Sequence, residues 1–204
     1  AGVRFWPVDS LPPELDEAWR GPRPDAPDFG HHIVAARTIR IRPRYWNRHV
    51  VTHELAHAWD RLRGRANLET FDSLGVARRR RAIIRESRIG AWSQGQLQQA
   101  FQSYRATMLR YGRNGAASQR SFELSFDGGG TAMRGYSFQH NVREFYAEGY
   151  AVFHGGSEYH QIKMYAFARP LFDLLTLEAR ARGQTVPNQS ALERAARRDG
   201  LLRQ

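Results

Sequence analysis

Residues 53–57 read His-Glu-Leu-Ala-His, which is an H-E-x-x-H pattern. On a helix, His53 and His57 stand one turn apart on the same face, so their two imidazoles can bind one zinc ion. Glu54 follows the first histidine and lies beside that metal, where its carboxylate can take a proton from a metal-bound water. The pattern therefore predicts a zinc-dependent hydrolase with His53 and His57 as metal ligands and Glu54 as the general base.

The sequence around this pattern favours a helix. Residues 46–62 carry apolar side chains at helical spacing, and no Pro or Gly occurs before Gly64. An alternation of apolar and polar residues at 38–42 comes before it and predicts a half-exposed strand. A strand that leads into the metal-binding helix is the arrangement that zinc peptidases need. The alternative is a helix with two incidental histidines, because so short a pattern also arises by chance.

Composition limits the class of protein. The 204 residues, 41% of them hydrophobic, suit one domain with a real core. No segment is long and apolar enough to span a bilayer, and no N-terminal signal sequence is present, so we expect a soluble protein. The chain has no cysteine, which excludes disulfides and a Cys-ligated metal and leaves His and carboxylate ligands.

The formal net charge is +11, and almost all of the positive charge is arginine. The densest run is the four arginines at 78–81. Such a run can bind nucleic acid, acidic lipid or an acidic protein, but it is more often a solvated face. No zinc-finger spacing, aromatic RNA-binding signature or helix-turn-helix accompanies it, so the sequence argues against a nucleic-acid partner.

The chain divides into three parts. Residues 1–30 hold six of the nine prolines and read as a lead-in or linker, 31–186 as the main domain, and 187–204 as a helical tail. Within the domain we expect helices at 70–93, 94–111, 141–153 and 158–182, where Pro170 starts a new helix or kinks one. Residues 121–138 predict a hairpin around a glycine-rich turn. The fold class is α+β, mainly helical with a small sheet.

A catalytic zinc needs a third protein ligand and an open coordination position. Metzincins place a Gly and a His after the second histidine, where this chain has Asp60 and Arg63, so that class is excluded. Glu144 and Glu148 lie four residues apart on a predicted helix and share one face. This spacing suits one metal ligand and one carboxylate that orients a ligand histidine. The alternative is a pair of surface glutamates, but their aromatic neighbours favour a buried helix.

The segments 53–60 and 144–150 resemble the gluzincins, and in particular the catalytic domains of the anthrax lethal factor family, whose motifs read H-E-F-G-H-A-V-D and E-F-F-A-E-A-F. The resemblance extends over roughly residues 32–182 and rests on these two motifs. It implies a zincin-like metallopeptidase domain with one catalytic Zn²⁺.

The resemblance also implies a role for each matching residue. His53, His57 and Glu144 correspond to the three ligands, and Glu54 corresponds to the base. Two further carboxylates, Glu148 and Asp60, would support the ligands from behind.

The same family stabilises the oxyanion with a tyrosine shortly before the glutamate helix. Tyr136 corresponds most closely to this tyrosine, and Tyr146 and His140 are the alternatives. The resemblance further implies a protein or peptide substrate. It suggests a toxin or effector domain that is secreted or delivered into a target cell, with a delivery module or a cognate inhibitor as further partners.

Three functions follow from these observations. The leading interpretation is a zinc endopeptidase. The second is a degenerate zincin fold that binds an acidic partner or nucleic acid through its arginines, and the intact Glu54 argues against it. The third is a zinc hydrolase that acts on a non-peptide amide, which the sequence does not separate from the first.

Overall fold

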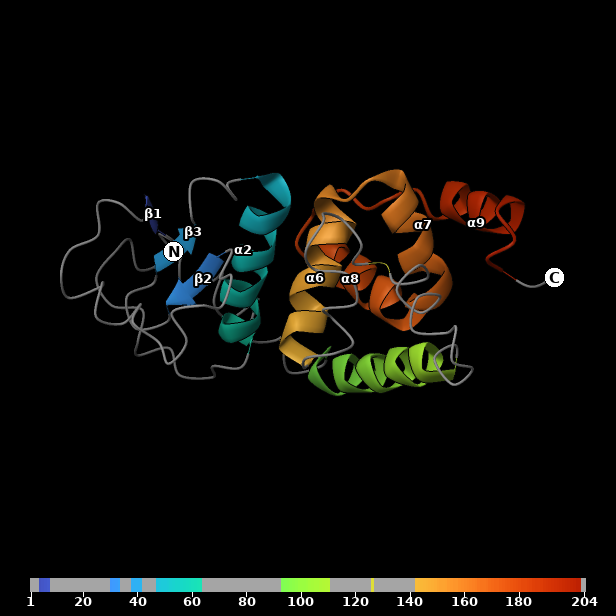
Figure 1. The fold of residues 1–204 in the computed structure, drawn as a ribbon, viewed down its shortest axis with the longest axis horizontal. Helices are drawn as coiled ribbons and strands as arrows, with labels where there is room; N and C mark the ends of the chain where they lie inside the picture. Colours follow the sequence, from blue (N-terminus) through green and yellow to red (C-terminus); the bar gives the residue numbers. More distant parts are fainter. Residues whose placement is uncertain are drawn as a thin grey trace.

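The computed structural model describes residues 4–7, 30–33, 38–41, 47–63, 93–110, 126 and 142–202. Six helices account for most of these residues, and three short strands account for the rest of the regular structure (Figure 1). The prediction of a mainly helical fold is therefore confirmed. The zincin-like fold and the division into three parts stay predictions.

The strands are β1 (Arg4–Pro7), β2 (Gly30–Ile33) and β3 (Thr38–Ile41), in the order β1-β3-β2. The central strand β3 coincides with the alternating segment of the sequence. It runs parallel to β1, with Thr38 opposite Arg4, and antiparallel to β2, with Thr38 opposite Ile33. The strand β1 lies within the Pro-rich segment predicted as a lead-in.

The H-E-x-x-H pattern lies on α2 (Arg48–Arg63), close to the predicted bounds of 46–62. The helix begins after Asn47, whose side-chain oxygen accepts a hydrogen bond from the backbone N–H of Val50 at 3.0 Å. This contact satisfies a donor that would otherwise have no partner in the first turn. The helix α2 lies between the sheet and α6 (Val142–Gly155) (Figure 1).

Three more helices follow α6: α7 (Glu158–Phe167), α8 (Arg169–Ala181) and α9 (Gln189–Arg198). The expected break at Pro170 is present, because a new helix, α8, begins at Arg169 and has Pro170 in its first turn. Proline is tolerated there because the backbone N–H groups of the first turn have no partner within the helix. A further helix covers 93–110, close to the predicted 94–111. No helix in the described ranges has both the length and the hydropathy to cross a bilayer.

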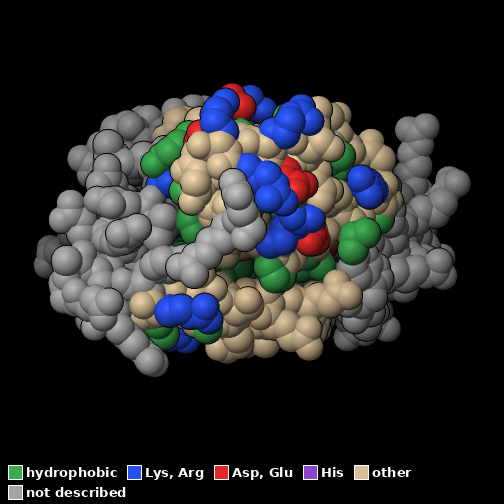
Figure 2. All heavy atoms as spheres, turned by 90° about the vertical axis from the view of Figure 1, so that its right-hand side faces the viewer, with side chains coloured by type: hydrophobic (Ala, Val, Ile, Leu, Met, Phe, Trp, Pro, Cys, Tyr) green, Lys and Arg blue, Asp and Glu red, His purple; other side chains and the backbone are tan. Residues whose placement is uncertain are grey.

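Several charged side chains on the C-terminal helices lie beside one of opposite sign (Figure 2). Arg169 Nε lies 2.8 Å from Asp173 Oδ1, and Arg197 Nη2 lies 2.9 Å from Glu193 Oε1, both at a spacing of four residues. Such exposed pairs contribute little stability. Three predicted features lie outside the described residues: the arginine run at 78–81, the helix at 70–93 except for Ser93, and the hairpin at 121–138 except for Phe126.

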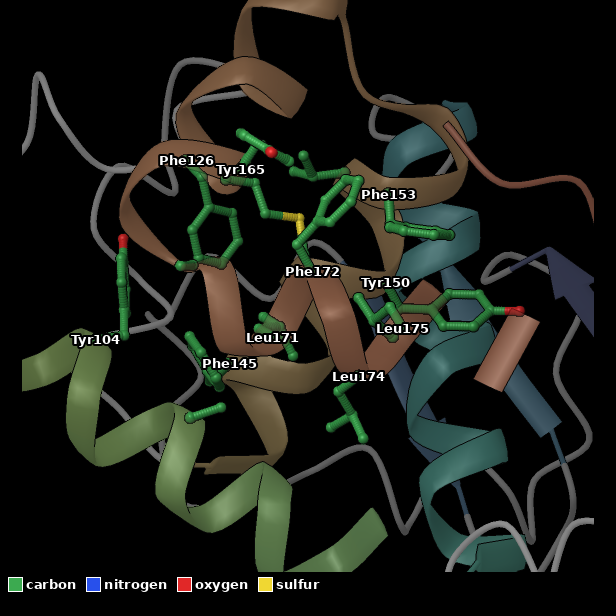
Figure 3. Close-up of a cluster of buried hydrophobic side chains, with 14 of the residues drawn as sticks. Tyr104, Phe126, Phe145, Tyr150, Phe153, Tyr165, Leu171, Phe172, Leu174 and Leu175 are labelled. Carbon is green, nitrogen blue, oxygen red and sulfur yellow. The ribbon is translucent and has the colours of Figure 1, made fainter. Parts of the chain in front are cut away.

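Aromatic rings fill the space between α6 and the helix at 93–110 (Figure 3). The ring of Phe145 lies 5.3 Å from that of Phe101 and 5.2 Å from that of Tyr104, measured between centroids. Two turns farther along α6, the ring centroid of Phe153 lies 5.4 Å from that of Phe172 of α8. The helix α6 is buried continuously from Phe145 to Phe153, so it forms the centre of the described part of the molecule.

Replacement of Gly149 tests this packing. A Cβ atom at residue 149 would lie 2.3 Å from Cδ2 and 3.2 Å from Cγ of Leu171, which is fully buried. The change Gly149→Ala should therefore lower the free energy of unfolding by about 1–3 kcal/mol, the usual cost of overpacking a core. Chemical denaturation measures this change. The matched control is Gly95→Ala, because a Cβ there meets nothing within 4 Å; equal destabilisation by both variants would contradict the packing.

Candidate metal centre

The helices α2 and α6 lie side by side in opposite directions. At one end, Arg48 Nη2 donates to the backbone oxygen of His154 at 3.1 Å. At the other end, His57 contacts Glu144. This alignment places the histidines of α2 opposite the glutamates of α6, although the two segments are far apart in the sequence.

Three side chains from these two helices converge on one point. His53 Nε2 and His57 Nε2 lie 3.0 Å apart, and each lies 3.3 Å from Glu144 Oε2. One ring nitrogen from each histidine and one carboxylate oxygen thus form a nearly regular triangle. This group could hold a metal ion. The structure brings together the three residues that the sequence predicted as ligands.

The group is buried at one corner and more open at the other two. His53 is buried, with 4% of its surface exposed. The side chains of His57 and Glu144 keep 18% and 19% of their surface exposed. The side of His57 and Glu144 is therefore the more exposed side of the group.

Glu148, which the sequence predicted as a carboxylate that orients a ligand, lies against His53. Its Oε1 lies 2.8 Å from His53 Nδ1, and its side chain is fully buried. A ligand histidine commonly points its other ring nitrogen at a carboxylate, which fixes the ring and its tautomer. Here the contact is an ion pair without the alignment of a hydrogen bond, and it places Nδ1 of His53 at Glu148 while Nε2 lies at the triangle with Glu144.

These contacts shift the pKa values of the group. Burial by itself would lower the pKa of His53, but the carboxylates of Glu148 and Glu144 outweigh burial and raise this pKa to about 10. Burial would raise the pKa of both glutamates, yet the facing histidines hold each pKa well below its usual range. In the metal-free protein the histidine is therefore protonated at neutral pH, and the two glutamates are ionised.

Glu54 is also buried, with 5% of its surface exposed. Burial raises the pKa of its carboxyl, and the charges of His53 and His57 only partly oppose this shift. A carboxylate whose pKa lies above its ordinary value is a better proton acceptor at neutral pH than an exposed one. The residue predicted as the base thus stands next to the ligand group in an environment that suits this role.

The remaining predicted site residues fall into two groups. Tyr136 and His140 lie outside the described residues. Tyr146 is fully buried, and its hydroxyl donates to Glu178 Oε2 of α8 at 2.9 Å, which places it in the core of the helical part. Asp60 is partly buried on α2, one turn beyond His57, and its supporting role stays a prediction.

Sequence reasoning missed one residue of this cluster. His49 Nε2 lies 3.0 Å from Glu148 Oε2, so the buried carboxylate contacts two histidines of α2. The signal was present in the sequence, because His49 precedes His53 by four residues just as His53 precedes His57. Three histidines at this spacing share one face of a helix.

The chain matches no protein-family model, no curated protein and no solved structure in comparisons with all three. The resemblance to the lethal factor family therefore rests on the two motifs alone. The geometry of the candidate metal centre stands independently of it.

Metal binding at this group should release a proton. A ligand histidine must be neutral, whereas the pKa of His53 is raised to about 10 in the metal-free protein. The apparent affinity for Zn²⁺ as a probe ion should therefore rise about tenfold per pH unit between about pH 7 and pH 9. Competition with a chromophoric chelator at several pH values measures this slope.

The control for this prediction is Glu148→Gln, which removes one of the charges that raise the pKa of His53. Its affinity should depend less steeply on pH over the same interval. An affinity of the unchanged protein that is independent of pH would contradict the prediction.

Proposed function

We propose that this chain is a zinc-dependent endopeptidase that hydrolyses peptide bonds with Glu54 as the general base. The observation that carries the proposal is the convergence of His53, His57 and Glu144 from two helices, with Glu54 buried beside them. Two imidazoles and one carboxylate are the ligand set of a large class of catalytic zinc sites.

The spacing of the ligand atoms supports zinc. In a tetrahedral site with bonds of about 2.0–2.1 Å, neighbouring ligand atoms lie about 3.3 Å apart. The three distances observed here are 3.0, 3.3 and 3.3 Å. Nitrogen and oxygen donors from imidazole and carboxylate also suit zinc better than the larger calcium ion, which prefers six or more oxygens.

When bound, zinc would act as a Lewis acid, which polarises a carbonyl and lowers the pKa of water. The chain's own residues supply the proton transfers. Glu54 takes the proton from the attacking water and then gives it to the amine that leaves when the peptide C–N bond breaks. His53 is held by Glu148 throughout, and the exposed side of His57 and Glu144 gives the substrate access.

The same motifs support a wider proposal. We place the chain with secreted or delivered toxin and effector domains that cut a protein or peptide of the target cell, because the two motifs resemble the lethal factor family. Tyr136 is proposed as the donor to the oxyanion. Tyr146 is the weaker choice for this role, since its buried hydroxyl already contacts Glu178.

The charge distribution weakens the alternative of a basic binding module. Residues 142–202 contain eight Arg or Lys residues and seven Asp or Glu residues, so the C-terminal helices are almost neutral. Most of the excess positive charge of the chain, +9 of +11, therefore lies in residues 1–141. The candidate metal centre, by contrast, is built from α2 and α6 without any lysine or arginine among its ligands.

Replacement of Glu54 tests the proposed reaction. The change Glu54→Gln keeps the shape of the side chain but removes the base, so turnover should fall by about 10²–10⁴-fold while zinc stays bound. Cleavage of a peptide library, read by mass spectrometry, measures turnover, and elemental analysis measures zinc. The control is Glu158→Gln on the exposed start of α7, which should stay fully active; an active Glu54→Gln protein would refute the assignment of the base.

Replacement of the two glutamates of α6 separates their roles. Glu144→Ala removes a ligand and should abolish stoichiometric zinc binding. Glu148→Gln only loosens His53 and should weaken zinc binding by about 10–100-fold. Chelator competition gives both affinities. Full zinc occupancy in Glu144→Ala together with loss of zinc in Glu148→Gln would exchange the two assignments.

A further inference from the structure

Three histidines follow one another along one face of α2, and the H-E-x-x-H pattern accounts for only two of them. His49 precedes the pattern by one helical turn. It does not belong to the triangle of ligand atoms, which is formed by His53, His57 and Glu144. Its Nε2 instead lies 3.0 Å from Glu148 Oε2.

Glu148 thus contacts one histidine through each of its oxygens. Oε1 lies 2.8 Å from His53 Nδ1, and Oε2 lies 3.0 Å from His49 Nε2. The carboxylate is fully buried, whereas the side chain of His49 keeps 20% of its surface exposed. These contacts therefore form a chain that starts at the ligand group, passes through Glu148 and ends at the partly exposed His49.

A buried carboxylate keeps one orientation only when its oxygens have partners. Oε2 of Glu148 has a hydrogen bond with His49 Nε2, whereas Oε1 contacts His53 Nδ1 as an ion pair without the alignment of a hydrogen bond. A buried carboxylate oxygen that loses its hydrogen-bond donor costs free energy. If the contact from His49 to Oε2 were lost, the carboxylate would lower its free energy by turning towards water. That rotation would carry Oε1 away from His53 Nδ1, and the ring of His53 would lose the contact that orients it.

We propose that His49 is a positioning residue of the metal centre, which holds Glu148 so that Glu148 can hold His53. The inference deepens the proposed zinc site and rests on it. His49 touches neither the metal ligands nor the substrate in this role. Its contribution reaches the metal through Glu148 alone, so it should be seen in metal affinity and should vanish when Glu148 is altered.

The test compares Zn²⁺ affinities, measured by competition with a chromophoric chelator on the full chain. His49→Ala should weaken zinc binding by about tenfold, the lower end of the range for residues that support a ligand. His49→Gln keeps an N–H donor of similar reach and should restore most of this loss. Thermal unfolding of the metal-free proteins shows that each variant is folded.

The matched control is Arg48→Ala. Arg48 is the neighbour of His49 and also joins α2 to α6, but it does so through the backbone oxygen of His154. If His49 mattered only because it holds the two helices together, Arg48→Ala would weaken zinc binding to the same extent, and this result would overturn the inference. We expect the zinc affinity of Arg48→Ala to stay unchanged.

A double-mutant cycle decides the route of the effect. In a Glu148→Gln background, His49→Ala should produce no further loss of affinity. An equal loss in both backgrounds, or no loss in the unchanged background, would overturn the role assigned to His49. Failure of the unchanged protein to bind zinc at all would instead overturn the proposed metal site, so the two failures are distinguishable.

Discussion

The burial of ionised carboxylates against the histidines of α2 is the constraint on which the site depends. Removing a carboxylate from water costs several kcal/mol unless an opposite charge and hydrogen-bond donors replace the water. Glu148 is fully buried and has His49 and His53 as its two contacts. Its burial is therefore tolerable only while α2 and α6 keep their antiparallel alignment. The alignment that satisfies Glu148 is also the one that brings Glu144 to both ligand histidines.

An adjacent face of α6 fixes that alignment through apolar packing. Phe145 directly follows Glu144 and packs against Phe101 and Tyr104 of the helix at 93–110 (Figure 3). A packed aromatic core has few alternative arrangements and resists small displacements. A rotation of α6 that moved Glu144 away from the histidines would also pull Phe145 out of this core. The apolar packing and the polar group therefore stabilise the same position of one helix.

The sequence predicted most of the described helices, and the placement of His53 and His57 on one helix face, for physical reasons that are local, whereas the choice of Glu144 as third ligand came from the resemblance. Apolar side chains at helical spacing and the i, i+4 placement of His53 and His57 depend only on the geometry of one helix. The contact between Tyr146 and Glu178 joins residues 32 positions apart, and no local pattern reveals it. The role of His49 was missed for the same reason. Its spacing was visible, but its partner Glu148 lies 99 residues away on another helix.

The buried position of Glu54 supports the proposed catalytic role over a site that merely stores a metal ion. Two histidines and one glutamate suffice to hold an ion, and a storage site gains nothing from another carboxylate beside them. Burial raises the pKa of Glu54, which means that its ionised form costs free energy in the metal-free protein. Such a cost beside three side chains that could hold a metal ion supports the proposed role of Glu54 in proton transfer. A surface that binds an acidic partner needs exposed positive charge, and a buried acid beside the histidines does not contribute to it.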